Sequence, residues 1–153
     1  MVAVTDVDLV IDFLNTVDHD EGTDLLADPG GWSSWLAARG LSDASLAAVH
    51  SARDALRVAV GDAGLAGSVG ASVRVSLRDG VPVVVADDVV GAVLAAASRL
   101  AVLDQWDRVK ICPAQDCRWA FYDRSRNHSR TWCSMQICGN RQKARAWRER
   151  TGH

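Results

Sequence analysis

The sequence predicts an α+β protein: a mostly helical N-terminal domain with one β-hairpin, followed by a small four-cysteine module with a basic C-terminal helix. Apolar residues recur at helical spacing over much of the chain, one Asp-Gly pair separates two apolar runs, and all four cysteines lie in the last third. A chain of 153 residues, of which 48% are hydrophobic, can bury a core. We expect the two domains to comprise residues 1–105 and 106–153.

Three helices are predicted upstream of the segment "GDAGLAGSVGA", which is typical of a loop. The first rests on apolar residues at helical spacing, namely Leu9, Phe13 and Val17. "GGWSSWLAARG" predicts a short helix closed by Gly40. Ser42 is the expected cap of a longer helix over about 43–60. Its apolar face comprises Leu46, Val49, Ala52, Leu56 and Ala59.

A β-hairpin is the clearest local prediction in the first domain. In "SVRVSLRDGVPVVVADD", valine and leucine alternate with polar residues up to Asp79-Gly80, and a second apolar run follows. Asp-Gly between such runs favours a two-residue type I′ turn, which needs positive φ. We expect the hairpin over about 72–85, with Pro82 indicating that the return strand lies at an edge. A further helix is predicted over about 88–103, with a face formed by Val90, Val93, Leu94, Ala97, Leu100 and Ala101.

The four cysteines form two C-x4-C pairs separated by fifteen residues; they are Cys112, Cys117, Cys133 and Cys138. Two such pairs can surround a tetrahedral Zn²⁺, because each pair bends around the ion and the loop brings the pairs together. Four thiolates leave no position for water, so the predicted Zn²⁺ is structural. Two disulfides, an iron–sulfur cluster and four buried free thiols are the alternatives. His128, between the pairs, is expected at the surface or beside the ligands.

Aromatic residues are expected to cover this zinc module. "RWAFYD", residues 118–123, predicts a short strand with Trp119 and Phe121 on one side. Trp132, directly before Cys133, can cover the site from the other edge. A structural role is favoured over base stacking, because so small a module has little else to bury.

The formal net charge of −2 hides an uneven distribution along the chain. Residues 1–107 carry 6 arginines against 16 acidic residues, a net of −10, whereas residues 108–153 carry 11 basic residues against 3 acidic ones, a net of +8. A zinc tetrathiolate would offset about two of these positive charges. The remainder indicates an anionic partner, and attraction between the two halves is the alternative.

Two basic segments of the module are predicted to contact phosphate. The polar loop "DRSRNHSR" precedes Cys133, and a helix over about 141–150, capped by Asn140, follows Cys138. Gly139 is expected to take a backbone conformation that other residues resist. Arginine forks onto phosphate, and a basic helix anchored by a metal site commonly meets nucleic acid; docking on the acidic domain is the alternative. The expected contacts are Arg124, Arg126, Arg130, Arg141, Lys143, Arg145 and Arg148, of which Arg141 and Arg145 are the best placed to reach a base edge.

The stretch "CPAQDCRWAFYDRSRNHSRTWCSMQICGNRQKAR" resembles the CGNR zinc finger, named after the tetrapeptide found here as Cys138–Arg141. It departs from the family at Thr131, where members often have a second arginine. In that family the finger follows a domain called ABATE, and "LVIDFLNTVD" resembles the opening motif of that domain through Asp12, Phe13, Asn15 and Thr16. The resemblance implies zinc ligation by the four cysteines and suggests DNA binding by a stress-induced bacterial transcription regulator.

We therefore expect a cytoplasmic bacterial DNA-binding transcription regulator that is not an enzyme. RNA stays a possible target, since the phosphate argument does not distinguish the two polymers. The alternatives are a zinc-stabilised protein–protein adaptor and a thiolate-based redox or metal sensor without direct DNA binding.

Further partners are expected on weaker grounds. Asp12, Asn15 and Thr16 are a candidate site for a small-molecule effector, with a polar-capped helix end as the alternative. A homodimer is expected because symmetric dimers are common. The first residues lack a basic start, and no apolar run is long enough to span a bilayer, so neither a secretory leader nor a membrane contact is expected.

Overall fold

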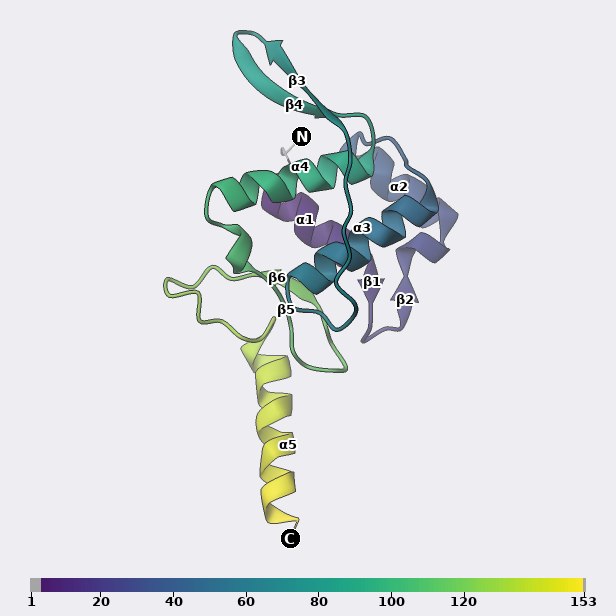
Figure 1. Cartoon of the computed structure of the whole chain (residues 1–153). Helices are drawn as coiled ribbons and strands as arrows, with labels where there is room; N and C mark the ends of the chain where they lie inside the picture. The colour runs from purple at the N-terminus through teal and green to yellow at the C-terminus, as the bar shows by residue number, and fades with distance from the viewer. Residues whose placement is uncertain (1–3, 153) are drawn as a thin grey trace.

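The computed structural model describes residues 4–152, which form five helices and three two-stranded antiparallel sheets. The helices are α1 (Asp6–Leu14), α2 (Pro29–Arg39), α3 (Leu46–Ala59), α4 (Val89–Val102) and α5 (Asn140–Thr151). The paired strands are β1 (Val17–Asp18) with β2 (Thr23–Asp24), β3 (Val73–Arg78) with β4 (Val81–Ala86), and β5 (Val109–Ile111) with β6 (Ala120–Tyr122). Short turns are η1 (Leu25–Ala27), η2 (Trp106–Arg108) and η3 (Met135–Gly139). The β3–β4 hairpin projects from one end of the helical body and α5 from the other (Figure 1). The predicted α+β class is confirmed.

Helix α1 lies in the core, against α3, α4 and β6. It begins with a capping box, in which the Thr5 hydroxyl accepts from the Asp8 amide and the Asp8 carboxylate accepts from the Thr5 amide. The predicted continuation to Val17 is wrong, since Val17 lies in β1. The helix ends because the side-chain amide of Asn15 makes two hydrogen bonds with the backbone of Ala120. Its Nδ2 donates to the Ala120 carbonyl at 2.9 Å, and its Oδ1 accepts from the Ala120 amide at 2.8 Å. A tertiary contact thus overrides the helical spacing.

The second helix ends as predicted, whereas the third begins later than predicted. Gly40 has φ +62° and closes α2 in the left-handed conformation. Ser42 does not cap α3; Ser45 does, through a side-chain bond from the Ala48 amide. The Ser42 carbonyl instead accepts from the Val89 amide at 2.8 Å, which holds the preceding segment extended against the start of α4.

The hairpin and α4 are confirmed close to their predicted bounds. Strands β3 and β4 are joined by Asp79 at φ +49° and Gly80 at φ +80°, as a type I′ turn requires. Asp88 caps α4 by accepting from the Gly91 amide at 2.9 Å. Both elements were predictable because their signals are local.

The zinc module packs on the helical body. Val109, Ile111 and Ala120 belong to the same buried core as the residues of α1, α3 and α4. The Ile111 amide also donates to the carbonyl of Val60, just beyond α3, at 3.2 Å. Strands β5 and β6 therefore form part of the core. The boundary at residues 105 and 106 stays a prediction.

Candidate metal centre and basic helix

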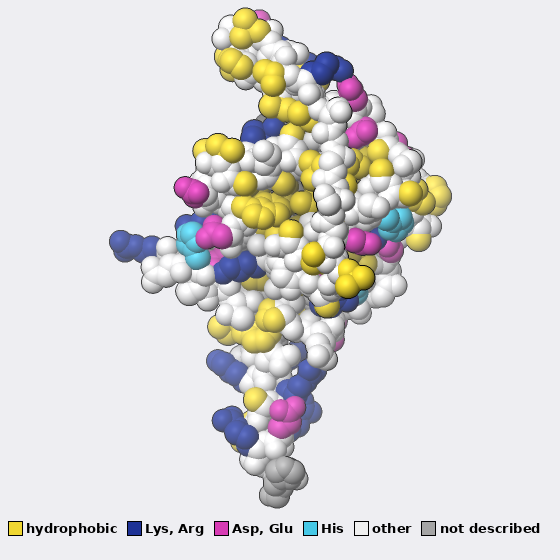
Figure 2. All heavy atoms as spheres, in the orientation of Figure 1, with side chains coloured by type: hydrophobic (Ala, Val, Ile, Leu, Met, Phe, Trp, Pro, Cys, Tyr) yellow, Lys and Arg dark blue, Asp and Glu magenta, His cyan; other side chains and the backbone are white. Residues whose placement is uncertain are grey.

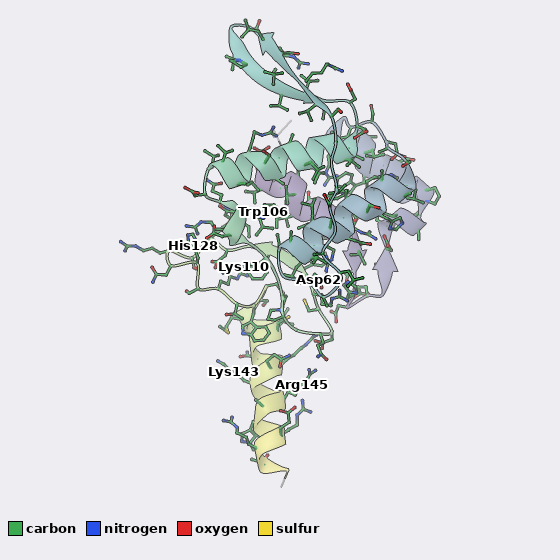
Figure 3. All side chains as sticks on the ribbon, viewed as in Figure 1. Asp62, Trp106, Lys110, His128, Lys143 and Arg145 are labelled. Atoms are coloured by element: carbon green, nitrogen blue, oxygen red, sulfur yellow. The ribbon has the colours of Figure 1, made fainter. Side chains whose placement is uncertain are left out.

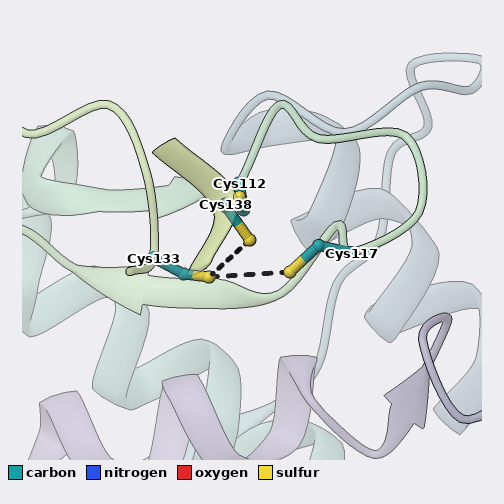
Figure 4. Close-up of side chains that lie close together, drawn as sticks. All are labelled: Cys112, Cys117, Cys133 and Cys138. Carbon is teal, nitrogen blue, oxygen red and sulfur yellow. Dashed lines mark hydrogen bonds between the residues drawn. The ribbon is translucent and has the colours of Figure 1, made fainter. Parts of the chain in front are cut away.

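The four cysteine sulfurs lie together at the junction between the helical body and α5 (Figure 4). All of them lie within 4.8 Å of one another, with Sγ–Sγ distances of 3.5 Å for Cys117 and Cys133 and 3.6 Å for Cys133 and Cys138. All four are free thiols, and these distances far exceed a disulfide bond. Zinc–sulfur bonds of 2.3 Å in a tetrahedron place sulfurs about 3.8 Å apart. The arrangement therefore fits a tetrahedral Zn²⁺ bound by Cys112, Cys117, Cys133 and Cys138.

The first pair of cysteines is held by the strands of the core. Cys112 directly follows β5, and its amide donates to the carbonyl of Trp119 at 2.9 Å. The chain then turns back, because the amides of Cys117 and Arg118 both donate to the carbonyl of Ala114 at 3.0 Å. Arg118 takes a positive φ of 52° at this turn. The two sulfurs thus point from a strand end and a tight loop toward the same place.

The second pair leads directly into the basic helix. Cys138 lies in η3, a single π-type turn that Ser134 caps through a side-chain bond from the Ile137 amide. Because η3 continues into α5, the predicted role of Asn140 as a cap is wrong; Asn140 is the first residue of α5. Gly139 has an ordinary helical φ of −61°, so the expected unusual backbone is also wrong. A side chain at Gly139 would instead crowd Met135.

Thiolates this close repel one another, so the thiols do not ionise alike. Burial would raise the pKa of Cys112, but hydrogen bonds with the backbone of Cys133 and Ala114 outweigh it and lower that pKa. Burial and the neighbouring thiols raise the pKa of Cys138 to about 12, and the same causes raise the pKa of Cys133 above its usual range. A divalent cation offsets this repulsion, because zinc binds the thiolate form and stabilises it. The site is thus built for a bound cation rather than for four neutral thiols.

Aromatic side chains cover the site as predicted. Phe121 is 6% exposed and packs in a small core with Cys112 and Cys138, against which Trp132 also lies. Trp119 is 37% exposed. It lines a cavity of about 210 Å³ beside the sulfurs.

The basic loop before Cys133 is organised by a buried carboxylate. Asp123 is fully buried and accepts from Lys110 Nζ at 2.7 Å and from the Ser125 and Arg130 amides. Burial alone would raise the pKa of Asp123, but these hydrogen bonds outweigh it and lower the pKa well below its usual range. The His128 ring bonds Asp107 at 2.7 Å and is partly exposed, which matches the surface alternative of its prediction (Figure 3).

Three predicted phosphate contacts come from this loop, and they differ in whether the side chain is already engaged within the protein. Arg124 and Arg126 are exposed, with the Arg124 guanidinium 5.5 Å from the ring centre of Tyr122. Arg130 instead donates to the carbonyls of Trp132 and Cys133, and so helps to hold the second cysteine pair in place.

The other four predicted contacts lie on α5, which projects from the body. None of its twelve residues, all of them described, is buried, so the helix does not pack on the acidic part of the chain and meets it only through Arg141. Lys143 and Arg145 extend to either side of the helix (Figure 3). Arg141, in the first turn, lies 3.7 Å from Asp20 and 3.8 Å from Asp116. Arg148 is exposed near the far end.

The candidate effector residues lie together but are engaged within the protein. Asp12, Asn15 and Thr16 line one cavity of about 600 Å³. Asp12 pairs with Arg39 at 2.7 Å, Asn15 holds Ala120, and the buried Thr16 hydroxyl donates to the carbonyl of Phe13. These contacts match the alternative of a polar-capped helix end, and an effector stays a prediction.

The sequence reasoning missed a buried ionic network between α3 and the zinc module. Arg57 is 3% exposed and donates to Asp62, to the Leu14 carbonyl and to the Arg118 carbonyl, each at 2.7 Å. Asp62 also accepts from the Arg118 side chain at 2.7 Å. Burial would raise the pKa of Asp62, but the hydrogen bonds from Arg118 and the charge of Arg57 lower it instead. Arg57 shares the apolar face of its helix, which was the available signal.

Comparisons with known proteins identify both parts of the chain. A family model described as "CGNR zinc finger" matches residues 108–151, and the ABATE model, described as "Putative stress-induced transcription regulator", matches residues 7–121. No curated protein matches the chain. The two matches overlap over β5 and β6, the strands that join the core to the cysteine cluster. Among residues 4–152, no helix has the length and apolar character needed to cross a membrane.

Proposed function

Because the chain belongs to the ABATE family and carries a CGNR zinc finger with a structural Zn²⁺ site, we propose that it is a cytoplasmic bacterial transcription regulator that binds DNA through α5. In this role it binds nucleic acid and does not act as an enzyme. The observation that carries the proposal is the basic helix itself, which leaves the body directly from the zinc site and has no buried residue, its first turn alone reaching Asp20 and Asp116 through Arg141.

The charge of α5 supports contact with a polyanion. Its twelve residues include Arg141, Lys143, Arg145, Arg148 and Arg150 against a single acid, Glu149. Beyond Arg141, whose ion pairs are long, so much like charge on one exposed helix is unfavourable unless a partner neutralises it. A helix of this size fits the major groove, where arginine can reach both phosphates and guanine edges.

The zinc site gives this helix a fixed starting direction. An isolated helix of twelve residues is marginal in water, because nucleation is costly. Cys138 lies two residues before the start of α5, so a Zn²⁺ bound to the four sulfurs connects this helix to Cys112 and Cys117 of the core. We infer that zinc orders the helix before DNA arrives, which lowers the entropic cost of binding.

Arg141 connects the DNA-binding helix to the acidic part of the chain. Its pairs with Asp20 and Asp116 are long, and all three side chains are about half exposed. Exposed pairs of this kind contribute about 0–1 kcal/mol, so a phosphate can replace them at little cost. Arg141 therefore stays a proposed contact for phosphate or a base edge, together with Arg145.

Duplex binding at several salt concentrations tests the proposal. Zinc-loaded protein is titrated into a labelled DNA pool, and the logarithm of the association constant is plotted against that of the salt concentration. The slope should be about −0.9 per phosphate neutralised, so an Arg145→Ala, Arg148→Ala double variant should lower its magnitude by about 1.8. Arg74→Ala, at the opposite end of the molecule, is the control and should leave the slope unchanged. Absence of binding to any duplex at low salt would contradict the proposal. Tighter binding to RNA than to DNA would contradict DNA as the target and indicate RNA instead.

A redox or metal sensor is the second candidate, because the cavity beside the sulfurs opens on Cys117 and Cys133, which are half-buried. Peroxide entering there would oxidise two thiolates to a disulfide, be reduced to water with two protons, and release zinc. Zinc release can be followed with a chromogenic chelator during mild peroxide treatment. Zinc that stays bound would exclude this role. A small-molecule effector stays a prediction that no contact described above supports further.

A further inference from the structure

An arginine-lined cavity of about 470 Å³ lies where α3, the loop after it, β1 and the zinc module meet. Its volume falls in the range of small-molecule sites in proteins. Asp62, which lines it, lies where the chain leaves α3 (Figure 3). The polar side chains of its lining belong to Arg53, Arg57, Arg118, His19, Asp54 and Asp62. None of these lines the cavity that contains the candidate effector residues, so the two cavities are separate.

Two of the arginines share one carboxylate. Asp62 accepts from Arg57 Nε at its Oδ2 and from Arg118 Nε at its Oδ1, both at 2.7 Å. Arg53 has a carboxylate of its own, since its two terminal nitrogens donate to Asp24 at 2.7 Å. Three guanidinium groups are therefore bonded to two carboxylates, which leaves one positive charge in excess.

The excess charge is accessible from the cavity and acts on its surroundings. The Arg118 side chain is 31% exposed, and Asp62 contacts its Nε and Nη2 through a single oxygen. The pKa of His19 is lowered by partial burial and by the charges of Arg118 and Arg57. An electrostatic field that disfavours a protonated imidazole favours an anion at the same place.

The rest of the lining is apolar and is contributed largely by the loop after α3. Leu65 lines the cavity although it is 94% exposed, so an apolar group bound there would remove hydrophobic surface from water. Gly64 has a φ of +151°, and a Cβ at this position would lie 2.9 Å from Val58 Cγ2. The loop backbone thus lies close against α3, which fixes this edge of the cavity.

We propose that the arginine-lined cavity binds a small organic carboxylate, with the anionic group at Arg118 and an apolar body against Val58 and Leu65. Guanidinium groups bind carboxylates through paired N–H donors. One excess positive charge matches a monoanion, whereas a phosphate group with nearly two negative charges would exceed it. Because Arg118 directly follows Cys117, the bound molecule would contact the helical body and the zinc module at once.

This inference does not depend on DNA binding. No residue of α5 lines the arginine-lined cavity. The basic side chains of that helix gather at the projecting end of the molecule (Figure 2). A test of the cavity therefore needs no nucleic acid, and either proposal can fail without the other.

Titration of the full-length, zinc-loaded chain, followed by NMR of its backbone amides, tests the proposal. Three probes are compared: benzoate has both the charge and an apolar body, acetate has the charge alone, and benzamide has the body alone. Benzoate should bind about tenfold more tightly than either of the others, with shifts concentrated at residues 53–65 and 118. Equal affinity for benzoate and benzamide, or no saturable shifts at these residues with benzoate, would overturn the proposal.

Substitutions separate recognition of the anion from a loss of folding. Arg118→Gln should lower the affinity for benzoate by about tenfold, whereas Arg124→Gln, in the exposed loop of the zinc module, should leave it unchanged. The Asp54 carboxylate is 73% exposed and lies 4.0 Å from Arg53 Nε, so its charge repels the ligand. Asp54→Asn should therefore raise the affinity by about two- to fivefold, a gain that misfolding cannot produce. Asp87→Asn, at a side chain 65% exposed outside the cavity, is its control and should change nothing. An Asp54→Asn variant that binds benzoate no more tightly than the wild type, or a folded Arg118→Gln variant that binds it equally, would overturn the proposal.

Discussion

Replacing Arg57 by methionine should lower the free energy of unfolding by about 3–5 kcal/mol, the range for removing one partner of a buried ion pair. The guanidinium is 4% exposed, and its three nitrogens each make a bond of 2.7 Å. Methionine has a similar length and no donor, so the carbonyls of Leu14 and Arg118 lose partners at about 1–3 kcal/mol each. Asp62 retains Arg118, which limits the loss. The apolar contacts that methionine makes in this buried place offset a further part of the lost stability.

Urea unfolding of the zinc-loaded protein, followed by circular dichroism, measures this difference. For a chain of this size, 3–5 kcal/mol corresponds to a fall in melting temperature of about 6–20 °C. Arg74→Met is the control, because Arg74 pairs with Asp87 at the same distance of 2.7 Å, but the two side chains are 63% and 65% exposed. It should change stability by about 0–1 kcal/mol. If Arg57→Met were within 1 kcal/mol of the wild type, the network would not have the structural role assigned to it.

Three further predictions concern the metal, the acidic range and the end of α1. Chelation of zinc should remove hydrogen-exchange protection first from η3 and α5, because the binding energy of zinc, about 10 kcal/mol, holds such modules folded. Earlier loss of protection in α1 or α4 would contradict this. Acid should destabilise the protein partly through Asp24, whose pKa is lowered chiefly by its hydrogen bond with Arg53. The stabilisation is complete above about pH 5 and is lost as the pH falls through 4 and below, so Asp24→Asn should have a shallower pH dependence than the wild type in urea titrations at pH 3–7. Asn15→Ala should cost about 1–3 kcal/mol through its two bonds to Ala120, whereas Asn127→Ala, in the exposed loop, should cost close to nothing.

The features predicted correctly depend on residues adjacent in sequence or on the fixed coordination geometry of a metal ion. A type I′ turn follows from Asp79 and Gly80 alone, and α4 follows from the helical spacing of its apolar residues. The cysteine cluster is non-local, yet it was predictable because two equally spaced pairs satisfy one tetrahedral ion. The basic charge of the zinc module predicted contact with nucleic acid, and the family resemblance indicated DNA; both stay predictions.

The features that were missed depend on tertiary contacts. Helical spacing extends to Val17, but α1 stops where Asn15 meets Ala120, more than a hundred residues away in sequence. Alternation in the hairpin gave its two faces without indicating which of them would point away from the body. Buried arginines such as Arg57 are rare, so an arginine on an apolar helix face is normally expected to extend its charge to solvent.

The metal site joins two bodies that the chain builds separately. Cys112 and Cys117 are positioned from the core, since Cys112 follows β5 and Arg118, next to Cys117, is held by Asp62. Cys133 and Cys138 are positioned from the other side, through η3 and α5. A single Zn²⁺ shared by the two pairs is therefore the mechanical connection between the helical body and the basic helix. The direction of α5 consequently depends on all four sulfurs, and the loss of one ligand should loosen the whole helix rather than a single turn.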